Sequence, residues 1–188
     1  MQDYGSPVGF RLALKNPQKI QALIVQNGNA YEEGLSETGS VLKVYGATRD
    51  PKIEASLREM MKLEGTRFQY VEGAKNVTLI SPDAWLYDQA LLDRPGNVEI
   101  QLALFADYIS NVRSYPAWHE YLQKNQPPTL IVWGKNDPFF TVRNIDGFQR
   151  DLKNVEIHLL DGGHFALEEY NDEIAAYIRG FFDKQKIK

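Results

Sequence analysis

The stretch Thr129-Leu130-Ile131-Val132-Trp133-Gly134-Lys135-Asn136-Asp137-Pro138 carries the strongest indication of the fold. Residues 130–133 form a continuous apolar run that a glycine closes, which is typical of a strand buried on both faces of a parallel sheet. Asp137 lies just beyond this strand, among residue types that favour turns. Because functional side chains gather at the carboxyl ends of parallel strands, Asp137 is a candidate for chemistry as well as for a turn.

A second strand and a second polar loop follow along the chain. Residues 155–160 (VEIHLL) predict a strand, and Asp161-Gly162-Gly163-His164-Phe165 comes next. Loops after adjacent parallel strands lie side by side, so Asp137 could orient the His164 imidazole and stabilise its cation. Taken alone, each motif is as well explained by a turn or by an incidental histidine. Their occurrence after consecutive strands favours a functional pair.

The start of the chain predicts a turn that leads into a helix. Ser6 is expected to cap a helix over residues 6–16, with Pro7 at its first position, and residues 21–27 predict another buried strand. This arrangement places Asp3 near a helix N-terminus, where the helix dipole stabilises negative charge. Local sequence alone favours the simpler interpretation of Asp3 as a helix-flanking acid.

The segment between residues 30 and 126 predicts helices and no convincing strand. Asp50-Pro51 and Ser81-Pro82-Asp83 each open a helix, Asn97 is expected to cap one that ends near Asp107, and Tyr115-Pro116 is expected to start another. Seven of the ten tyrosines and two of the three tryptophans lie in this segment. These aromatic residues either form a core or line a small apolar pocket under a lid.

The whole chain is therefore interpreted as an α/β core interrupted by a helical insertion. Residues 1–29 hold the turn, a helix and a strand, residues 30–126 form a helical cap, and residues 127–188 complete the core. A chain of 188 residues suffices for one domain with an insertion.

Composition excludes several classes of function. A net charge of −4 without a basic cluster argues against nucleic-acid binding. The chain has no cysteine and three histidines, so neither a disulfide framework nor a metal site is expected. No apolar run reaches membrane-spanning length and the first residues do not form a signal peptide, so a cytoplasmic protein without membrane contact is expected.

Together these motifs resemble the α/β-hydrolases. DYGSPVGFRLAL (residues 3–14) and KIQALIVQN (19–27) resemble the nucleophile elbow, helix and next strand of the branch with an aspartate nucleophile, which holds haloalkane dehalogenases and epoxide hydrolases. WGKNDPFF (133–140) resembles the acid loop of that branch, and DGGHFALEE (161–169) resembles its histidine loop. The resemblance implies the C-terminal part of an α/β-hydrolase fold, with about three parallel strands, flanking helices and an inserted cap.

The resemblance also implies a reaction in two steps. Asp3 attacks a small apolar electrophile of the haloalkane or epoxide type and forms an alkyl ester. His164, oriented by Asp137, activates the water that hydrolyses this ester. The partners are a small-molecule substrate and water, and no metal or organic cofactor is implied. The sequence does not indicate an oligomeric state.

Two positions bear on the leaving group and the substrate. Tyr4 stands where the family commonly has a tryptophan that helps to hold a halide, so its backbone N–H is the expected leaving-group contact. Residues 107–111 resemble the cap segment that bears a proton-donating tyrosine of epoxide hydrolases. The candidate substrate-binding residues are Tyr108, Tyr70, Tyr87 and Trp85, with core packing as the alternative for each.

Further strands precede the elbow in this family, so the resemblance implies an N-terminally truncated chain. We expect the isolated chain to be unstable or to aggregate, because the strand at residues 21–27 would have an unpaired edge. Either Met1 is then an internal methionine taken as the start, or the gene is broken. Two alternatives stay open: an inactive fragment that serves as an interaction module, and a homologue in which Asp3 is not catalytic.

Overall fold

Three parallel strands form the centre of the structure, a computed structural model that describes residues 1–187. They are β1 (Leu23–Gln26), β2 (Thr129–Gly134) and β3 (Val155–Leu160), in the order β1-β2-β3. Ile131 of β2 pairs with Val25 on one side and with Ile157 on the other. The three predicted strands and the predicted parallel α/β core are confirmed.

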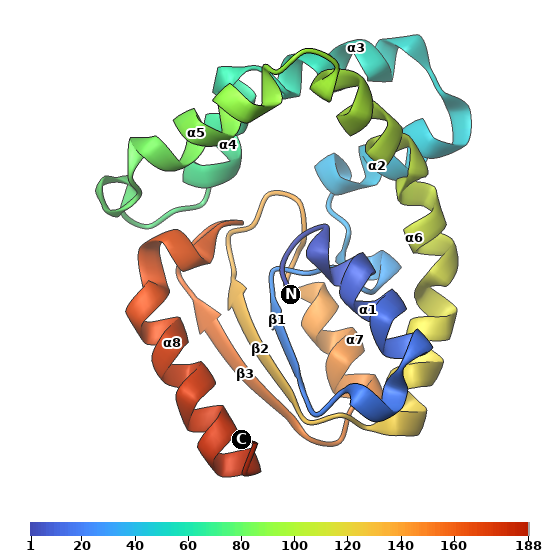
Figure 1. Cartoon of the computed structure of the whole chain (residues 1–188), viewed down its shortest axis with the longest axis vertical. Coiled ribbons are helices and arrows are strands. Elements are labelled where there is room, and N and C mark those ends of the chain that lie inside the picture. The colour runs from blue at the N-terminus through green and yellow to red at the C-terminus, as the bar shows by residue number, and fades with distance from the viewer. Residues whose placement is uncertain (188) are drawn as a thin grey trace.

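Helices cover both faces of this sheet (Figure 1). One face packs against α1 (Gly5–Lys15), α7 (Arg143–Asp151) and the second half of α6 (Asn97–Asn125), and the other packs against α8 (Ala166–Gln185). Alternate residues of β2 serve the two layers, because successive side chains of a strand point to opposite faces. Ile131 and Trp133 contribute to the first layer, whereas Leu130 and Val132 contribute to the second.

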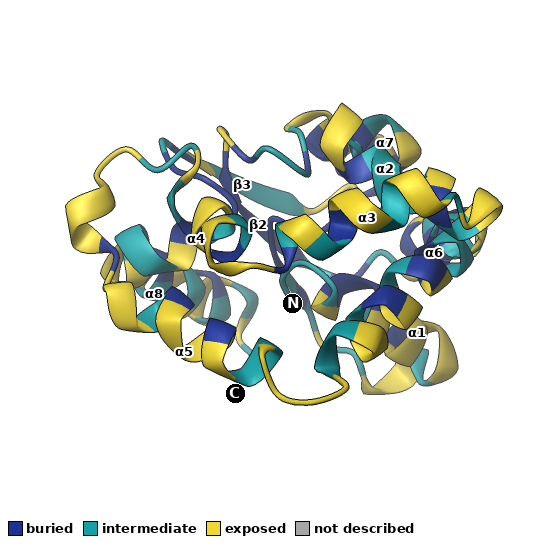
Figure 2. Cartoon of the chain, turned by 90° about the horizontal axis from the view of Figure 1, so that it is seen from above, coloured by how far each residue is buried: buried dark blue, intermediate teal, exposed yellow. Residues whose placement is uncertain are grey.

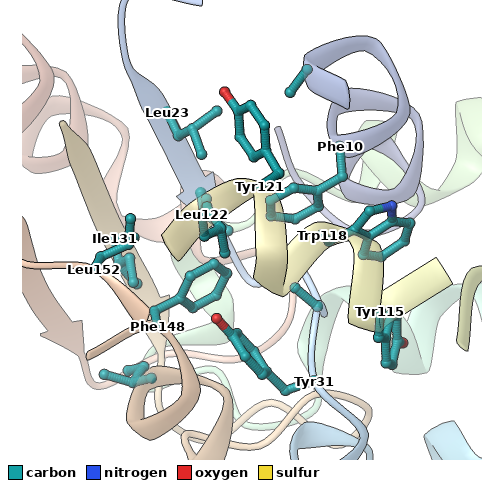
Figure 3. Close-up of a cluster of buried hydrophobic side chains, with 14 of the residues drawn as sticks. Phe10, Leu23, Tyr31, Tyr115, Trp118, Tyr121, Leu122, Ile131, Phe148 and Leu152 are labelled. Carbon is teal, nitrogen blue, oxygen red and sulfur yellow. The ribbon is translucent and has the colours of Figure 1, made fainter. Parts of the chain in front are cut away.

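The first layer is rich in aromatic side chains (Figure 3). Phe10 of α1 stacks on Trp118 of α6 with their ring centres 5.1 Å apart, and both residues are fully buried. Phe148 of α7 stacks on Phe10 from the other side. This cluster fixes α1, and with it the turn that precedes α1, against the sheet.

The remaining helices form an arch over the carboxyl ends of the strands (Figures 1 and 2). Besides the first half of α6, they are α2 (Glu37–Thr48), α3 (Pro51–Met60), α4 (Leu63–Val71) and α5 (Pro82–Leu92). Asp50 caps α3 and Ser81 caps α5 with their side chains, as predicted. Short 3-10 turns lie at Pro17–Lys19, Glu32–Gly34 and Val77–Leu79.

The predicted break of a helix at Tyr115-Pro116 is wrong. α6 is a single helix of 29 residues with Pro116 inside it, and Gly96 rather than Asn97 precedes its first turn. An internal proline costs about 3 kcal/mol. Trp118 and Leu122, close beyond it, are fully buried in the main core. An aromatic side chain buries about 150–250 Å² at about 25 cal/mol per Å² of apolar surface, so this packing outweighs the cost of the proline.

The predicted cap at Ser6 is also wrong. α1 begins at Gly5 with Tyr4 as the preceding residue, so Ser6 lies inside the first turn. Ser6 is fully buried, and a side chain on Gly28 would collide with its hydroxyl. The small residues Ser6 and Gly28 thus let the turn approach the end of β1 closely. This packing, rather than helix capping, determines the position of Ser6.

Residues 1–3 continue the sheet beyond β1. Gln2 forms a parallel bridge with Gln26, the N–H of Gln26 donates to the carbonyl of Met1 at 3.0 Å, and the N–H of Asp3 donates to the carbonyl of Asn27 at 3.2 Å. Beside this edge, α1 leaves Val8 and Leu12 more than half exposed. Within residues 1–187, none of the helices combines the length and the apolar character that crossing a membrane requires.

Candidate active site

The turn between residues 1–3 and α1 holds Asp3 in an unusual backbone conformation. Asp3 has a φ of 43°, in the left-handed region that few residues other than glycine adopt. Two hydrogen bonds close the turn: the N–H of Gly5 donates to Gln2 at 2.8 Å, and the N–H of Ser6 donates to Asp3 at 2.9 Å. The Asp3 carboxylate is thereby carried to the N-terminus of α1, with its side chain 41% exposed.

Asp137 follows β2, and its side chain is completely buried. Four hydrogen bonds reach the carboxylate. Its Oδ1 accepts from the backbone N–H groups of Phe139 at 2.8 Å and Phe140 at 3.1 Å, and its Oδ2 accepts from Asn27 Nδ2 at 2.7 Å and His164 Nδ1 at 2.9 Å. These four donors fix the buried carboxylate in position.

His164 follows β3 and is 2% exposed. While its Nδ1 donates to Asp137, its Nε2 lies 3.8 Å from Asp3 Oδ1. Phe139 and Phe165 contact the imidazole edge to face. The structure therefore brings together the three residues that the sequence analysis predicted as nucleophile, acid and base, Asp3, Asp137 and His164.

The two carboxylates control the charge of the imidazole. Burial alone would lower the pKa of His164, but hydrogen bonds and charge from Asp137 and Asp3 outweigh it and raise the pKa to about 10. Burial alone would raise the pKa of Asp3, but His164 and the nearby backbone N–H of Tyr4 hold it below its usual value. In the free site Asp3 is therefore an anion beside an imidazolium.

Asn27, which the sequence analysis did not single out, ties this arrangement to the strands. It is fully buried, and its φ of 42° turns the chain directly after β1. Its Nδ2 donates to Asp137 and, at 3.1 Å, to the carbonyl of Gly134, and its Oδ1 accepts from the N–H of Gly134 at 2.8 Å. Gln26 Nε2 donates both to Asn27 Oδ1 and to the carbonyl of His164. A polar residue directly after a buried strand was the available signal, as it was for Asp137.

A small apolar cavity of about 90 Å³ lies against Asp3 and His164. Leu57, Met61 and Phe105 are among the arch residues that line it. Tyr108 also lines it; this residue is 2% exposed, and its hydroxyl has no hydrogen-bond partner within residues 1–187. The cavity thus combines apolar walls with one unused buried hydroxyl.

A larger groove of about 460 Å³ adjoins this cavity. Asp3, Tyr4 and Gln69 line both spaces. The hydroxyl of Tyr4 donates to the carbonyl of Leu104 in α6 at 3.1 Å, which joins the turn to the arch. Tyr70 lines the groove, and its hydroxyl donates to Asp88 at 2.5 Å.

The structure does not bring the other two predicted substrate-binding residues to these spaces. Trp85 is 8% exposed and packs in a cluster with Tyr70 and Ile80, as the alternative of core packing predicts. Tyr87 is 68% exposed on the outer side of α5, and neither residue lines the cavity or the groove. In the part of the chain that the structure describes, no cluster of three or more metal-binding side chains occurs.

Comparison with known proteins identifies the family of the fold. A family model described as alpha/beta hydrolase fold matches residues 2–170. An uncharacterized hydrolase of Saccharomyces cerevisiae, YNR064C, is 41% identical over 184 residues, which are 96% of this chain and 63% of the yeast protein. The chain thus spans less than two thirds of the length of the curated relatives it matches.

Solved structures show the same architecture. The epoxide hydrolase CorEH superimposes with a TM-score of 0.72 at 16% identity, over 97% of this chain and 66% of that one. The haloalkane dehalogenase DatA of Agrobacterium tumefaciens C58 gives a TM-score of 0.66 at 21% identity, over 98% and 65%. Other structures at similar scores bear the names serine hydrolase and meta-cleavage product hydrolase, so this likeness shows the fold alone.

Proposed function

Because the chain belongs to the alpha/beta hydrolase fold family, we propose that the protein hydrolyses small apolar electrophiles of the haloalkane or epoxide type through an ester on Asp3. One observation carries the proposal: the residue on the elbow is a carboxylate, it lies 3.8 Å from His164 Nε2, and it faces an apolar cavity. A carboxylate is ionised without help from a base, which suits attack on a saturated carbon.

In the first step an Asp3 oxygen attacks the carbon and forms a carbon–oxygen bond. The bond from that carbon to the leaving group breaks, and the leaving group departs as a halide or as the alkoxide of an opened epoxide. The low pKa of Asp3 supplies the anion at neutral pH. The backbone N–H of Tyr4 is the candidate donor to the leaving group, as the resemblance of the elbow implies.

In the second step water attacks the carbonyl carbon of the ester. His164 takes a proton from that water and returns it to the alkoxide as the ester carbon–oxygen bond breaks, so the alcohol leaves neutral. The second water proton leaves the new carboxyl group for solvent, and the Asp3 carboxylate returns. Ester formation removes the negative charge of Asp3, which is one of the causes of the raised pKa of His164. The pKa of His164 therefore falls once the ester has formed, so the imidazolium can release its proton to the leaving group or to solvent and be neutral when a base is needed. Asp137 keeps the ring in the same orientation.

Trapping the ester tests the nucleophile. In a His164→Ala variant of the complete protein, incubation with a terminal epoxide or a primary alkyl bromide should leave an adduct on the peptide that contains Asp3, measured by mass spectrometry. The matched His158→Ala variant removes a histidine that lies within β3 and does not line the cavity. This variant should turn over the substrate without accumulating an adduct. Turnover by Asp3→Asn at the wild-type rate would exclude the ester.

A Tyr108→Phe variant distinguishes epoxide opening from halide displacement. Its unpartnered hydroxyl supports donation to an epoxide oxygen, whereas a halide needs no proton. Tyr108→Phe should lower kcat for epoxides by about 10-fold or more and leave alkyl halide turnover within about 2-fold. Tyr121→Phe is the control, because this hydroxyl is also buried and unpartnered on α6 but lies in the main core. Equal loss for both substrates would remove the donor role from Tyr108.

A further inference from the structure

We propose that the substrate carries a hydrogen-bond donor group, a hydroxyl or an ammonium, beyond its reacting end, and that the groove lined by Gln69, Tyr70, Asp88 and Gln101 binds this group. The inference rests on the proposed function, because it places the reacting end of the same molecule at Asp3. It adds a substrate class that the apolar cavity alone does not indicate.

The first argument is size. The cavity beside Asp3 and His164 measures about 90 Å³, which is smaller than the engineered apolar cavity of about 150 Å³ that binds benzene. A molecule that reacts at Asp3 can therefore place only a short apolar group there. The groove of about 460 Å³ shares Asp3, Tyr4 and Gln69 with the cavity, so the rest of the molecule has a direct path into it.

The second argument is the chemistry of the groove. Its lining includes more polar side chains than that of the cavity, among them Asp88, Asn97 and Gln101. Asp88 accepts one hydrogen bond at Oδ2, from Tyr70 at 2.5 Å, and neither Gln69 nor Gln101 makes a side-chain hydrogen bond to residues 1–187. The groove therefore offers a carboxylate oxygen and two amides as partners for a ligand.

The third argument is charge. Asp3 and Asp88 both line the groove, and the lining residues that the structure describes include no lysine or arginine. Like charges repel across a shared space and opposite charges attract. A substrate with a carboxylate tail is thus disfavoured, whereas a donor group that is neutral or positive can bind Asp88.

A matched series of substrates tests the inference in the complete protein. Terminal epoxides with a chain of equal length ending in methyl, hydroxyl, dimethylammonium (which keeps one N–H donor) or carboxylate are compared by kcat/KM. The hydroxyl and ammonium compounds should exceed the methyl compound by about 5- to 10-fold, and the carboxylate should fall below it by a similar factor. The differences should lie in KM, since the tail does not touch the reacting atoms.

Variants of Asp88 assign the effect to this groove. Asp88→Asn should bring the ammonium and carboxylate compounds within about 2-fold of each other, and Asp88→Lys should reverse their order. Asp83→Asn on the same helix is the control, because this exposed residue does not line the groove. Equal kcat/KM across the series in the wild type would overturn the inference while leaving the proposed function intact. Absence of turnover and of an ester on Asp3 with all four compounds would instead overturn the proposed function.

Discussion

The groups at the carboxyl ends of the strands and the groups on the arch above them are held in opposite ways. Asp137 receives four hydrogen bonds and has no exposed side-chain surface, and His164 is 2% exposed. On the arch, the Tyr108 hydroxyl has no partner and Tyr70 makes one side-chain hydrogen bond. In the proposed reaction this difference separates two tasks: the sheet fixes Asp137 and His164, whereas the arch offers the Tyr108 hydroxyl to a substrate.

The largest effect is expected where the sheet holds the imidazole. Asp137→Asn removes the anion that orients His164 and raises its pKa, so turnover should fall by about 10³–10⁴-fold, the scale seen for the triad aspartate of serine proteases. The ester on Asp3 should accumulate, measured by mass spectrometry. Asp161→Asn, an exposed aspartate before the same histidine, should stay within about 2-fold. Comparable losses in the two variants would contradict a special role for Asp137.

Removing the Asn27 amide that donates to Asp137 should lower kcat less than replacing Asp137 does. Asn27→Gly deletes the amide without straining a backbone at a φ of 42°. The loss of a hydrogen bond to a charged group costs about 1.5–3 kcal/mol, which corresponds to about 10–100-fold in kcat. Arg49→Gly, at a φ of 54° at the end of α2, controls for the glycine itself. An unchanged kcat in Asn27→Gly would show that the two strand ends position Asp137 without this amide.

The pH dependence of stability should report the same contacts. The pKa of His164 is raised from 6.5 to about 10 in the folded protein, so its protonation stabilises the fold fully below pH 6.5 and this contribution is lost as the pH rises through 10. The difference in free energy of unfolding between wild type and His164→Gln should therefore shrink from pH 6 to pH 10 in denaturant titrations. A difference in free energy of unfolding that grows with pH would contradict the raised pKa of His164.

The smallest effect is expected on the outer side of the arch. Tyr87→Ala should change kcat/KM by less than about 2-fold, because this side chain is 68% exposed. A large loss of kcat in Tyr87→Ala would show that the arch closes further over the substrate than this structure has it.

The buried residue Trp85 on the same helix should affect stability instead. Trp85→Ala should lower the free energy of unfolding by about 3–5 kcal/mol, the usual cost of emptying a buried aromatic site, while kcat is retained.

The sequence predicted the sheet better than the arch for a physical reason. Residues 130–133 are buried by both layers, so the pattern of that strand depends little on what packs against it. The loops after β2 and β3 could be paired because adjacent parallel strands bring their ends together. Asp3 needed the family resemblance, because local hydrogen bonds close its turn as in many turns, and only the fold brings it to within 3.8 Å of His164.

Tertiary packing explains what the sequence did not predict. Packing of Trp118 in the main core keeps α6 helical through Pro116, although a proline by itself favours a helix start. Exposure distinguishes Tyr87 from Tyr108, yet both are tyrosines in helices of the arch and their sequence surroundings do not separate them. Asn27 acquires its importance from Asp137, which lies 110 residues away in the sequence.

The continuity of α6 restricts how a substrate can reach Asp3. A helix of 29 residues is a rod about 43 Å long. Its far end is embedded in the core by Trp118 and Leu122, and its near half carries Tyr108 and the carbonyl of Leu104 that holds Tyr4. Moving this helix aside would break core packing, so we expect a substrate to reach Asp3 through the groove that α4 and α5 line. Tyr108 would then keep its position at the wall of the cavity beside Asp3.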